Sequence, residues 1–166
     1  MGALPDMITF SADGKYIMTA NEGEPSTDYL QDPNGTISII ETSNYSVTTL
    51  DFASFSNQAA ALAKDGFRIS KYAKSFAQDI EPEYITISDD SKTAWVTLQE
   101  NNGVAKVDLT SKTITAIYPL GLKDYNTAEN AIDVSDSDDK IAFSPWKVKG
   151  LYMPDAISHF SSKNVP

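Results

Sequence analysis

Two stretches of the chain alternate between apolar and polar positions with the two-residue period of β-strands. In the clearer stretch, the strand-like segments are rich in β-branched and aromatic residues and are separated by short polar turns. These segments are residues 84–88, 93–98, 104–109 and 113–118. Short strands at this spacing predict a four-stranded antiparallel meander, the size of one β-propeller blade.

The same pattern occurs once before in the chain. Residues 5–15 align without gaps on residues 82–92 and share Pro, Ile, Thr, Ser, Asp and Lys at equivalent places. The strands expected in this first unit are residues 8–11, 16–20, 36–41 and 46–52. A third copy starts at Pro154. An internal repeat of this length favours blades of one propeller, and two unrelated hairpins with similar turn chemistry are the alternative.

The predicted fold class is therefore all-β, with two four-stranded antiparallel propeller blades and the start of a third. The expected order is a blade at 5–52, an insertion at 53–80, a blade at 81–118, a long loop at 119–153 and the next blade from 154 to 166. Two blades do not close a propeller, which needs four to eight. We therefore expect a fragment of a larger propeller, whose sheet edges are covered by the remaining blades of the parent protein, by its own insertions or by another copy of the chain.

The sequence also predicts local structure in the insertion at 53–80 and in the long loop at 119–153. Residues 58–64 predict a short helix that begins near Ser56 or Asn57 and stops at Gly66, and residues 67–69 predict a short strand. In the long loop, we expect Trp146 and Tyr152 to pack against the sheet.

Composition excludes several classes of partner. The chain has 23 acidic and 13 basic residues and a net charge of −10, so nucleic acid and anionic membrane surfaces are not expected partners. It has no cysteine, which removes disulfides, zinc thiolates and a thiol nucleophile. No apolar run is long enough to span a membrane, so no membrane insertion is expected in this segment.

Most of the acidic residues fall in the long connections, which a meander brings to one end of the strands. The candidate ligands there for Ca²⁺ or Mg²⁺ are Glu22, Glu24, Asp28, Glu81, Glu83 and Glu100. Amide oxygens of Asn21, Asn101 and Asn102 would complete such a site. The alternatives are that Glu81 and Glu83 pair with Arg68 or a lysine, or that the acidic surface is simply solvated.

The other motifs in the sequence give weaker predictions of function than the acidic connections. Residues 132–140 suggest a calcium loop but depart from the EF-hand pattern at Lys140, which favours a solvated loop. The catalytic motifs of hydrolases, metalloproteases and nucleotide-binding proteins do not occur. His159 is the single histidine, so a serine–histidine–aspartate triad is not expected. Paired carboxylates for glycoside hydrolysis stay open, because distance along the sequence does not fix distance in space.

Several blocks of the sequence resemble the choice-of-anchor I domain, a family of surface or secreted proteins, and the blades are similar to YVTN propeller repeats. These blocks are residues 4–7, 20–25, 32–40, 81–85, 92–102, 119–124 and 152–157. The resemblance implies a β-propeller that is extracellular, at the cell surface or periplasmic. Members are often described as phytase-like or alkaline-phosphatase-like.

Three functions remain as hypotheses. The first is a surface module without established catalysis that binds a divalent cation, a cell-wall component or a protein through its acidic loops. The second, implied by the resemblance, is a calcium-dependent phosphoester hydrolase that uses the glutamates for metal and Arg68 for phosphate. Lys71 and Lys74 are the other local basic groups. The third is a purely structural scaffold.

Overall fold

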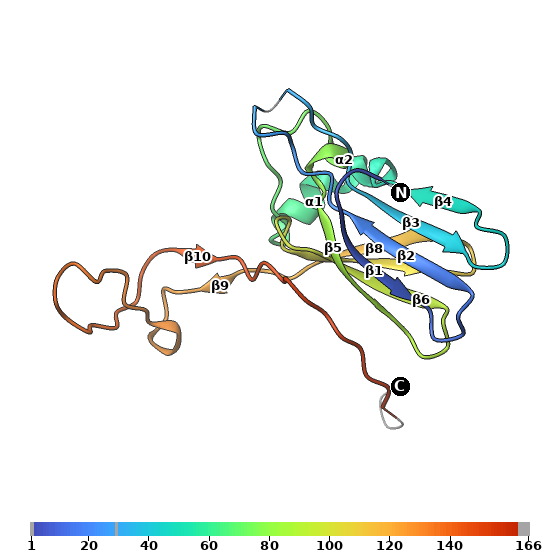
Figure 1. Cartoon of the computed structure of the whole chain (residues 1–166). Coiled ribbons are helices and arrows are strands. Elements are labelled where there is room, and N and C mark those ends of the chain that lie inside the picture. Colours follow the sequence, from blue (N-terminus) through green and yellow to red (C-terminus); the bar gives the residue numbers. More distant parts are fainter. Residues whose placement is uncertain (1, 29, 163–166) are drawn as a thin grey trace.

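The computed structural model describes residues 2–28 and 30–162. It contains two four-stranded antiparallel sheets and one two-stranded hairpin (Figure 1), and the predicted all-β class is confirmed. The last four residues of the expected third unit, 163–166, lie outside the described residues.

Both large sheets are simple meanders in which each strand pairs with its neighbour in sequence. The first contains β1 (Pro5–Phe10), β2 (Tyr16–Asn21), β3 (Thr36–Glu41) and β4 (Val47–Leu50). The second contains β5 (Pro82–Ile87), β6 (Thr93–Leu98), β7 (Gly103–Asp108) and β8 (Thr113–Pro119). Each strand predicted for the two blades is present, and its ends differ from the prediction by no more than three residues.

The two sheets share irregularities as well as order. The pairing of β1 with β2 shifts register between Pro5 and Met7, and the pairing of β5 with β6 shifts between Pro82 and Ile85. These are the positions that align in the sequence. A bulge in the same place on both inner strands supports the repeat, since bulges are specific features of a sheet and not random defects.

The core lies between the facing sides of the two sheets. Strand β5 packs against β1 and β2. Met18 and Ile39 from the first sheet and Val96 and Val107 from the second are fully buried there, and they belong to one continuous apolar cluster. Alternate residues along each strand supply this cluster, as the two-residue period requires.

Short helices fill the connection between the sheets. They are the 3₁₀-helix η1 (Ala53–Gln58), α1 (Ala59–Lys64) and α2 (Phe76–Asp79). The predicted helix is confirmed, but the expected N-cap is wrong, because Gln58 occupies that position and no side chain caps the helix. The strand expected at 67–69 is also wrong. That segment is irregular, and its Phe67 ring stacks on Phe76 beneath the helices.

Beyond β8, the chain leaves the sheets as an arm (Figure 1). Its hairpin pairs β9 (Lys123–Asp124) with β10 (Lys149–Gly150). Trp146 is 43% exposed and Tyr152 is 56% exposed, so the expectation that both rings pack into the sheet is wrong. Backbone bonds from the Tyr152 and Met153 amides to the Asn102 side chain attach the end of the arm instead.

Residues 154–162 contain no strand. This segment is tied to the second sheet through His159, which contacts Thr86 at 2.8 Å and Asp89 at 3.1 Å. In the described ranges, no helix combines the length and apolar character needed to cross a membrane.

Candidate functional site

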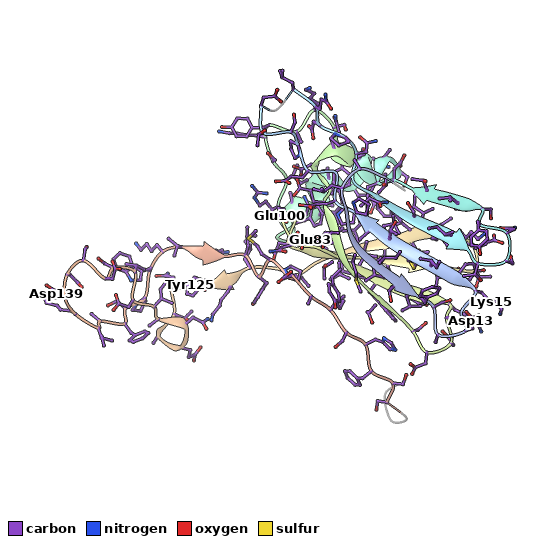
Figure 2. The ribbon with its side chains drawn as sticks, viewed as in Figure 1. Asp13, Lys15, Glu83, Glu100, Tyr125 and Asp139 are labelled. Atoms are coloured by element: carbon purple, nitrogen blue, oxygen red, sulfur yellow. The ribbon has the colours of Figure 1, made fainter. Side chains whose placement is uncertain are left out.

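The two ends of the sheets differ in charge and structure. Figure 2 places Glu83 and Glu100 at the end near the helices, and Asp13 and Lys15 at the opposite end of the strands. At that opposite end, short turns join the two blades: the Asp13 amide donates to the Ser91 hydroxyl at 3.0 Å, and Lys112 pairs with Glu41. The long acidic connections gather at the helical end.

Carboxylates from separate parts of the chain converge at this helical end. We call Glu22, Glu24, Glu81, Glu83 and Glu100 the acidic cluster. Burial, followed by the charges of Glu100, Glu22 and Glu24, raises the pKa of Glu81 to about 7. Burial and then Glu24 also raise the pKa of Glu22. The neighbouring carboxylates add to the effect of burial on the pKa of Glu81 and of Glu22, because negative charges at short range disfavour a further ionised group.

Glu83 and Glu100 form the closest pair in the cluster. Burial, the charge of Glu100 and a hydrogen bond between the two side chains raise the pKa of Glu83 to about 8. Oxygen Oε2 of Glu100 is buried without a hydrogen-bond partner. The Gln99 amide, turned with its nitrogen toward Glu83, donates to both oxygens of that carboxylate. Gln99 is neutral, so the negative charge of the pair is not compensated.

The bulge explains why Glu83 reaches the cluster. It lies in the register shift of β5, where the strict alternation of faces along the strand is broken. Asp6 occupies the equivalent bulge of β1, and its charge also acts on Glu22 and Glu83. The repeat therefore presents one acid from each inner strand to the same region.

No basic side chain in the part of the chain that the structure describes forms an ion pair with the acidic cluster. The ion pairs between described side chains are Lys15 with Asp13, Lys112 with Glu41 and His159 with Asp89. Among the described residues, Glu81 and Glu83 therefore form no ion pair with Arg68 or with a lysine. Within residues 2–28 and 30–162, no three acidic or histidine side chains are arranged to hold a metal ion as they stand.

The predicted amide ligands serve the fold instead. Asn21 bonds to Thr19, Thr36 and Ser38 inside the first sheet. The Asn101 oxygen accepts from the Glu81 amide, and the Asn102 oxygen accepts from the arm. Each side chain is fully buried. These three residues are structural links, and they are excluded from the ligand set.

Asp28 is the candidate that the structure separates from the others. Its carboxylate accepts from the Ser26 hydroxyl at 2.7 Å and from the Leu30 amide at 3.1 Å. These bonds lower its pKa. Asp28 therefore stabilises its own turn.

Arg68 lies beside the cluster in a separate cavity. Its guanidinium Nη1 donates to the Glu100 backbone carbonyl at 3.3 Å. The cavity has a volume of about 530 Å³, and its charged lining residues are Asp32, Arg68, Lys74 and Asp79. We call it the Arg68 cavity. Lys71 does not line it, and the Lys71 ammonium lies over the Tyr72 ring.

Asp79 is the residue that the sequence prediction missed. It is 8% exposed, and burial raises its pKa to about 6. Both of its oxygens accept from the Ser70 amide, at 3.0 and 3.1 Å, and Asn101 donates to one of them. Its position just before β5 gives no sequence signal of this, because burial depends on Asn101 from the next connection.

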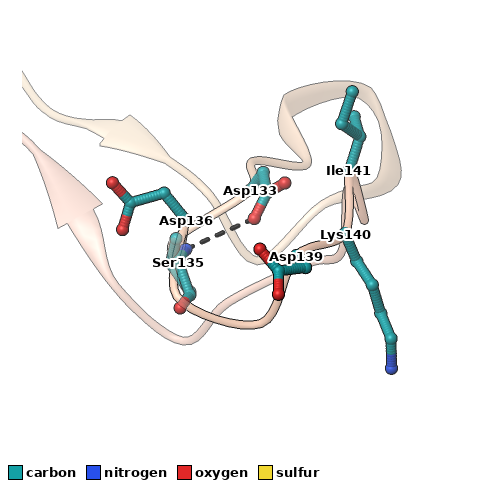
Figure 3. A pocket seen from close by; sticks show the side chains of 7 residues that line it. Asp133, Ser135, Asp136, Asp139, Lys140 and Ile141 are labelled. Atoms are coloured by element: carbon teal, nitrogen blue, oxygen red, sulfur yellow. Dashed lines mark hydrogen bonds between the residues drawn. The ribbon is translucent and has the colours of Figure 1, made fainter.

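The acidic loop on the arm forms its own hollow (Figure 3), with a volume of about 470 Å³. Asp133 accepts from the Ser135 amide at 3.3 Å and from the Ala142 amide at 3.0 Å. Asp139 on this loop lies far from Glu83 and Glu100 in Figure 2. The arm acids were expected at the same end as the cluster, and this expectation is wrong because the arm turns away from the sheets.

Comparisons with known proteins place the chain in a family. A search of curated proteins finds no match. Two solved structures are similar: "Structure of U3-55K" at 8% identity, TM-score 0.43, and "Kuenenia stuttgartiensis Hydrazine Synthase" at 14% identity, TM-score 0.45. The alignments cover 72% and 93% of this chain but 27% and 38% of those chains.

The family model of the choice-of-anchor I domain matches residues 1–165. The match extends over both blades and the arm, and it agrees with the blocks of sequence that resemble this family. A surface-associated domain is the general property that follows from it. The chain belongs to the choice-of-anchor I domain family.

Proposed function

We propose that this chain is an extracellular or cell-surface propeller module that binds a divalent cation at the acidic cluster. Ca²⁺ is the first candidate, because it accepts six to eight oxygen ligands in flexible geometry. The observation that carries the proposal is the convergence of Glu22, Glu81, Glu83 and Glu100 from three parts of the chain, without an ion-pair partner among the described basic side chains.

The protonation state of the glutamates determines how a cation would bind to the acidic cluster. At neutral pH, Glu83 is mostly protonated, since its pKa is about 8. A cation that binds between Glu83 and Glu100 replaces this proton and removes the repulsion between carboxylates. The two carboxylates then have to turn so that their oxygens face the cation instead of each other, which flexible glutamate side chains allow. Binding should therefore strengthen as the pH rises.

Thermal melting during a calcium titration tests this proposal. A ligand of the native state stabilises it by about 2.7 kcal/mol at a hundredfold excess over the dissociation constant. We expect melting temperature to rise with Ca²⁺ and to return after chelation, and we expect Glu22→Gln and Glu83→Gln to abolish the rise. Asp136→Asn is the matched control, because it removes a carboxylate from the distant arm.

Each result has a definite meaning. A rise that both glutamate variants remove, and that Asp136→Asn leaves intact, supports a site at the acidic cluster. A flat titration of the native chain refutes cation binding. A rise of equal size in all variants also refutes it, because nonspecific screening of a highly acidic protein gives that result. Assays with a generic phosphoester would follow only after the first result.

A further inference from the structure

The Arg68 cavity is a second concave site that the cation proposal does not use. Its volume of about 530 Å³ lies within the range of small-molecule sites. Three segments distant in sequence build it: the loop that carries Asp32, the irregular segment from Arg68 to Lys74, and the end of α2 at Asp79. The Gln78 side chain donates to the Asp32 backbone carbonyl and joins the first of these segments to the last.

Charged groups of both signs in this cavity lack partners. Oxygen Oδ1 of Asp32 is buried without a hydrogen bond. Among the described residues, Lys74 has no ion pair, and the Arg68 guanidinium makes only the single hydrogen bond to the Glu100 carbonyl. Asp79 differs, because the Ser70 amide already occupies both of its oxygens. A buried acceptor without a partner is unusual in folded proteins and indicates a donor that the chain does not supply.

The charge of the surroundings selects the class of ligand. A simple anion would be drawn to Arg68 and Lys74 but opposed by Asp32 and by the net charge of −10. A simple cation would meet Arg68 and Lys74 on entry. A molecule with an ammonium at one end and a carboxylate at the other satisfies both requirements and has no net charge.

We propose that the Arg68 cavity binds a small zwitterion with the chemistry of a free amino acid. Its carboxylate accepts from the Arg68 guanidinium and the Lys74 ammonium, since arginine donates in a fork that matches a carboxylate. Its ammonium donates to Asp32. The exposed Tyr72 ring at the border of the cavity contacts the carbon skeleton of the ligand.

Calorimetry with chelated, metal-free protein tests this proposal separately from the cation site. The probes are L-alanine and 4-aminobutyrate, with butyrate and butylamine as the matching molecules that carry one charge. We expect at least one zwitterion to bind about tenfold more tightly than either single-charge probe, which corresponds to about 1.4 kcal/mol. Each probe is titrated into the native chain and into variants whose melting curves show that they are folded.

Variants assign the binding to this cavity. Asp32→Asn, Arg68→Met and Lys74→Met should each weaken binding of the zwitterion about tenfold or more. Lys71→Met is the control for Lys74→Met, because Lys71 is close in sequence but does not line the cavity. Glu83→Gln should leave binding unchanged, and this separates failure of the cation proposal from failure of this one.

Two results would overturn the proposal. One is a zwitterion that binds no more tightly than butyrate and butylamine, including the case in which none of the four binds. The other is a zwitterion that binds the Arg68→Met and Asp32→Asn variants as well as it binds the native chain.

Discussion

The pH dependence of stability is a direct test of the electrostatics of the acidic cluster. Burial and neighbouring carboxylates raise the pKa of Glu81 to about 7 and of Glu83 to about 8, against an ordinary value of 4.5. Between about pH 4.5 and about pH 8, the folded chain therefore binds more protons than the unfolded chain. The stability that these groups contribute is fully present below about pH 4.5 and is lost as pH rises through about 8.

The size of the effect follows from the shift and the exposure of Glu83. A rise from 4.5 to about 8 would correspond to about 5 kcal/mol if the site were isolated from water. Glu83 is only partly buried, so solvent screening reduces the expected loss to about 1–2 kcal/mol. For a chain of this size, such a loss lowers the melting temperature by about 3–8 °C.

Thermal melts in chelator between about pH 5 and pH 8.5 measure this loss. The aspartates whose pKa is lowered, such as Asp13 and Asp89, have completed their titration below this window and do not contribute. Glu83→Gln should flatten the pH dependence only in part, because Glu81, with a pKa of about 7, and Asp79, with a pKa of about 6, still titrate in this window. Asp136→Asn should leave the pH dependence unchanged. A native melting temperature that stays constant or rises across the window would refute the reasoning, as would an unchanged slope in Glu83→Gln.

Three further predictions concern the fold. Ile39→Ala removes a fully buried side chain from the core and should cost about 2–4 kcal/mol in urea unfolding. Asn101→Ala leaves the Glu81 amide and the Asp79 carbonyl without their partner and should cost about 2–3 kcal/mol by the same measurement. A Cβ at Gly35 would overlap the Ile80 carbonyl oxygen, so Gly35→Ala should cost at least about 3 kcal/mol, whereas Gly14→Ala, in open space at φ +71°, should cost about 1 kcal/mol.

The strands could be predicted because each one combines alternation with turn chemistry at both ends. β6 and β3 begin and end at the predicted residues, and the bulges at Pro5 and Pro82 fall where the sequence repeats. The arm could not be predicted in this way. Trp146 and Tyr152 were expected to be buried because they are large aromatic residues, yet both are exposed. Residue type indicates which side chains gain from burial, but it does not show whether a surface to pack against lies nearby.

The residues of the acidic cluster could also be predicted only in part from the sequence. Meander geometry predicted that Glu22, Glu83 and Glu100 would come from connections at one end of the strands, and the structure brings them within electrostatic reach. Meander geometry did not reveal that the Asp28 carboxylate would accept a hydrogen bond within its own turn. It also did not reveal that the Asn101 side chain would donate to the Asp79 carboxylate. Asparagine and aspartate side chains bond to nearby backbone as readily as to a metal, and only the tertiary contacts decide between these roles.

The two ends of the sheets differ in how far their charged side chains are paired, and this difference bears on the role of the acidic cluster. At the turn end, Lys112 forms an ion pair with Glu41 across the blades, and the Asp13 backbone amide donates to the Ser91 hydroxyl. At the helical end, Glu81 and Glu83 are held close to other carboxylates although this raises the free energy of their ionised forms. Folding alone does not require that arrangement, because neutral glutamines in both places would fill the same space without repulsion. Uncompensated charge at the end that carries the long connections is what a binding site for a positive ligand requires, and strain of this kind is concentrated where a protein functions.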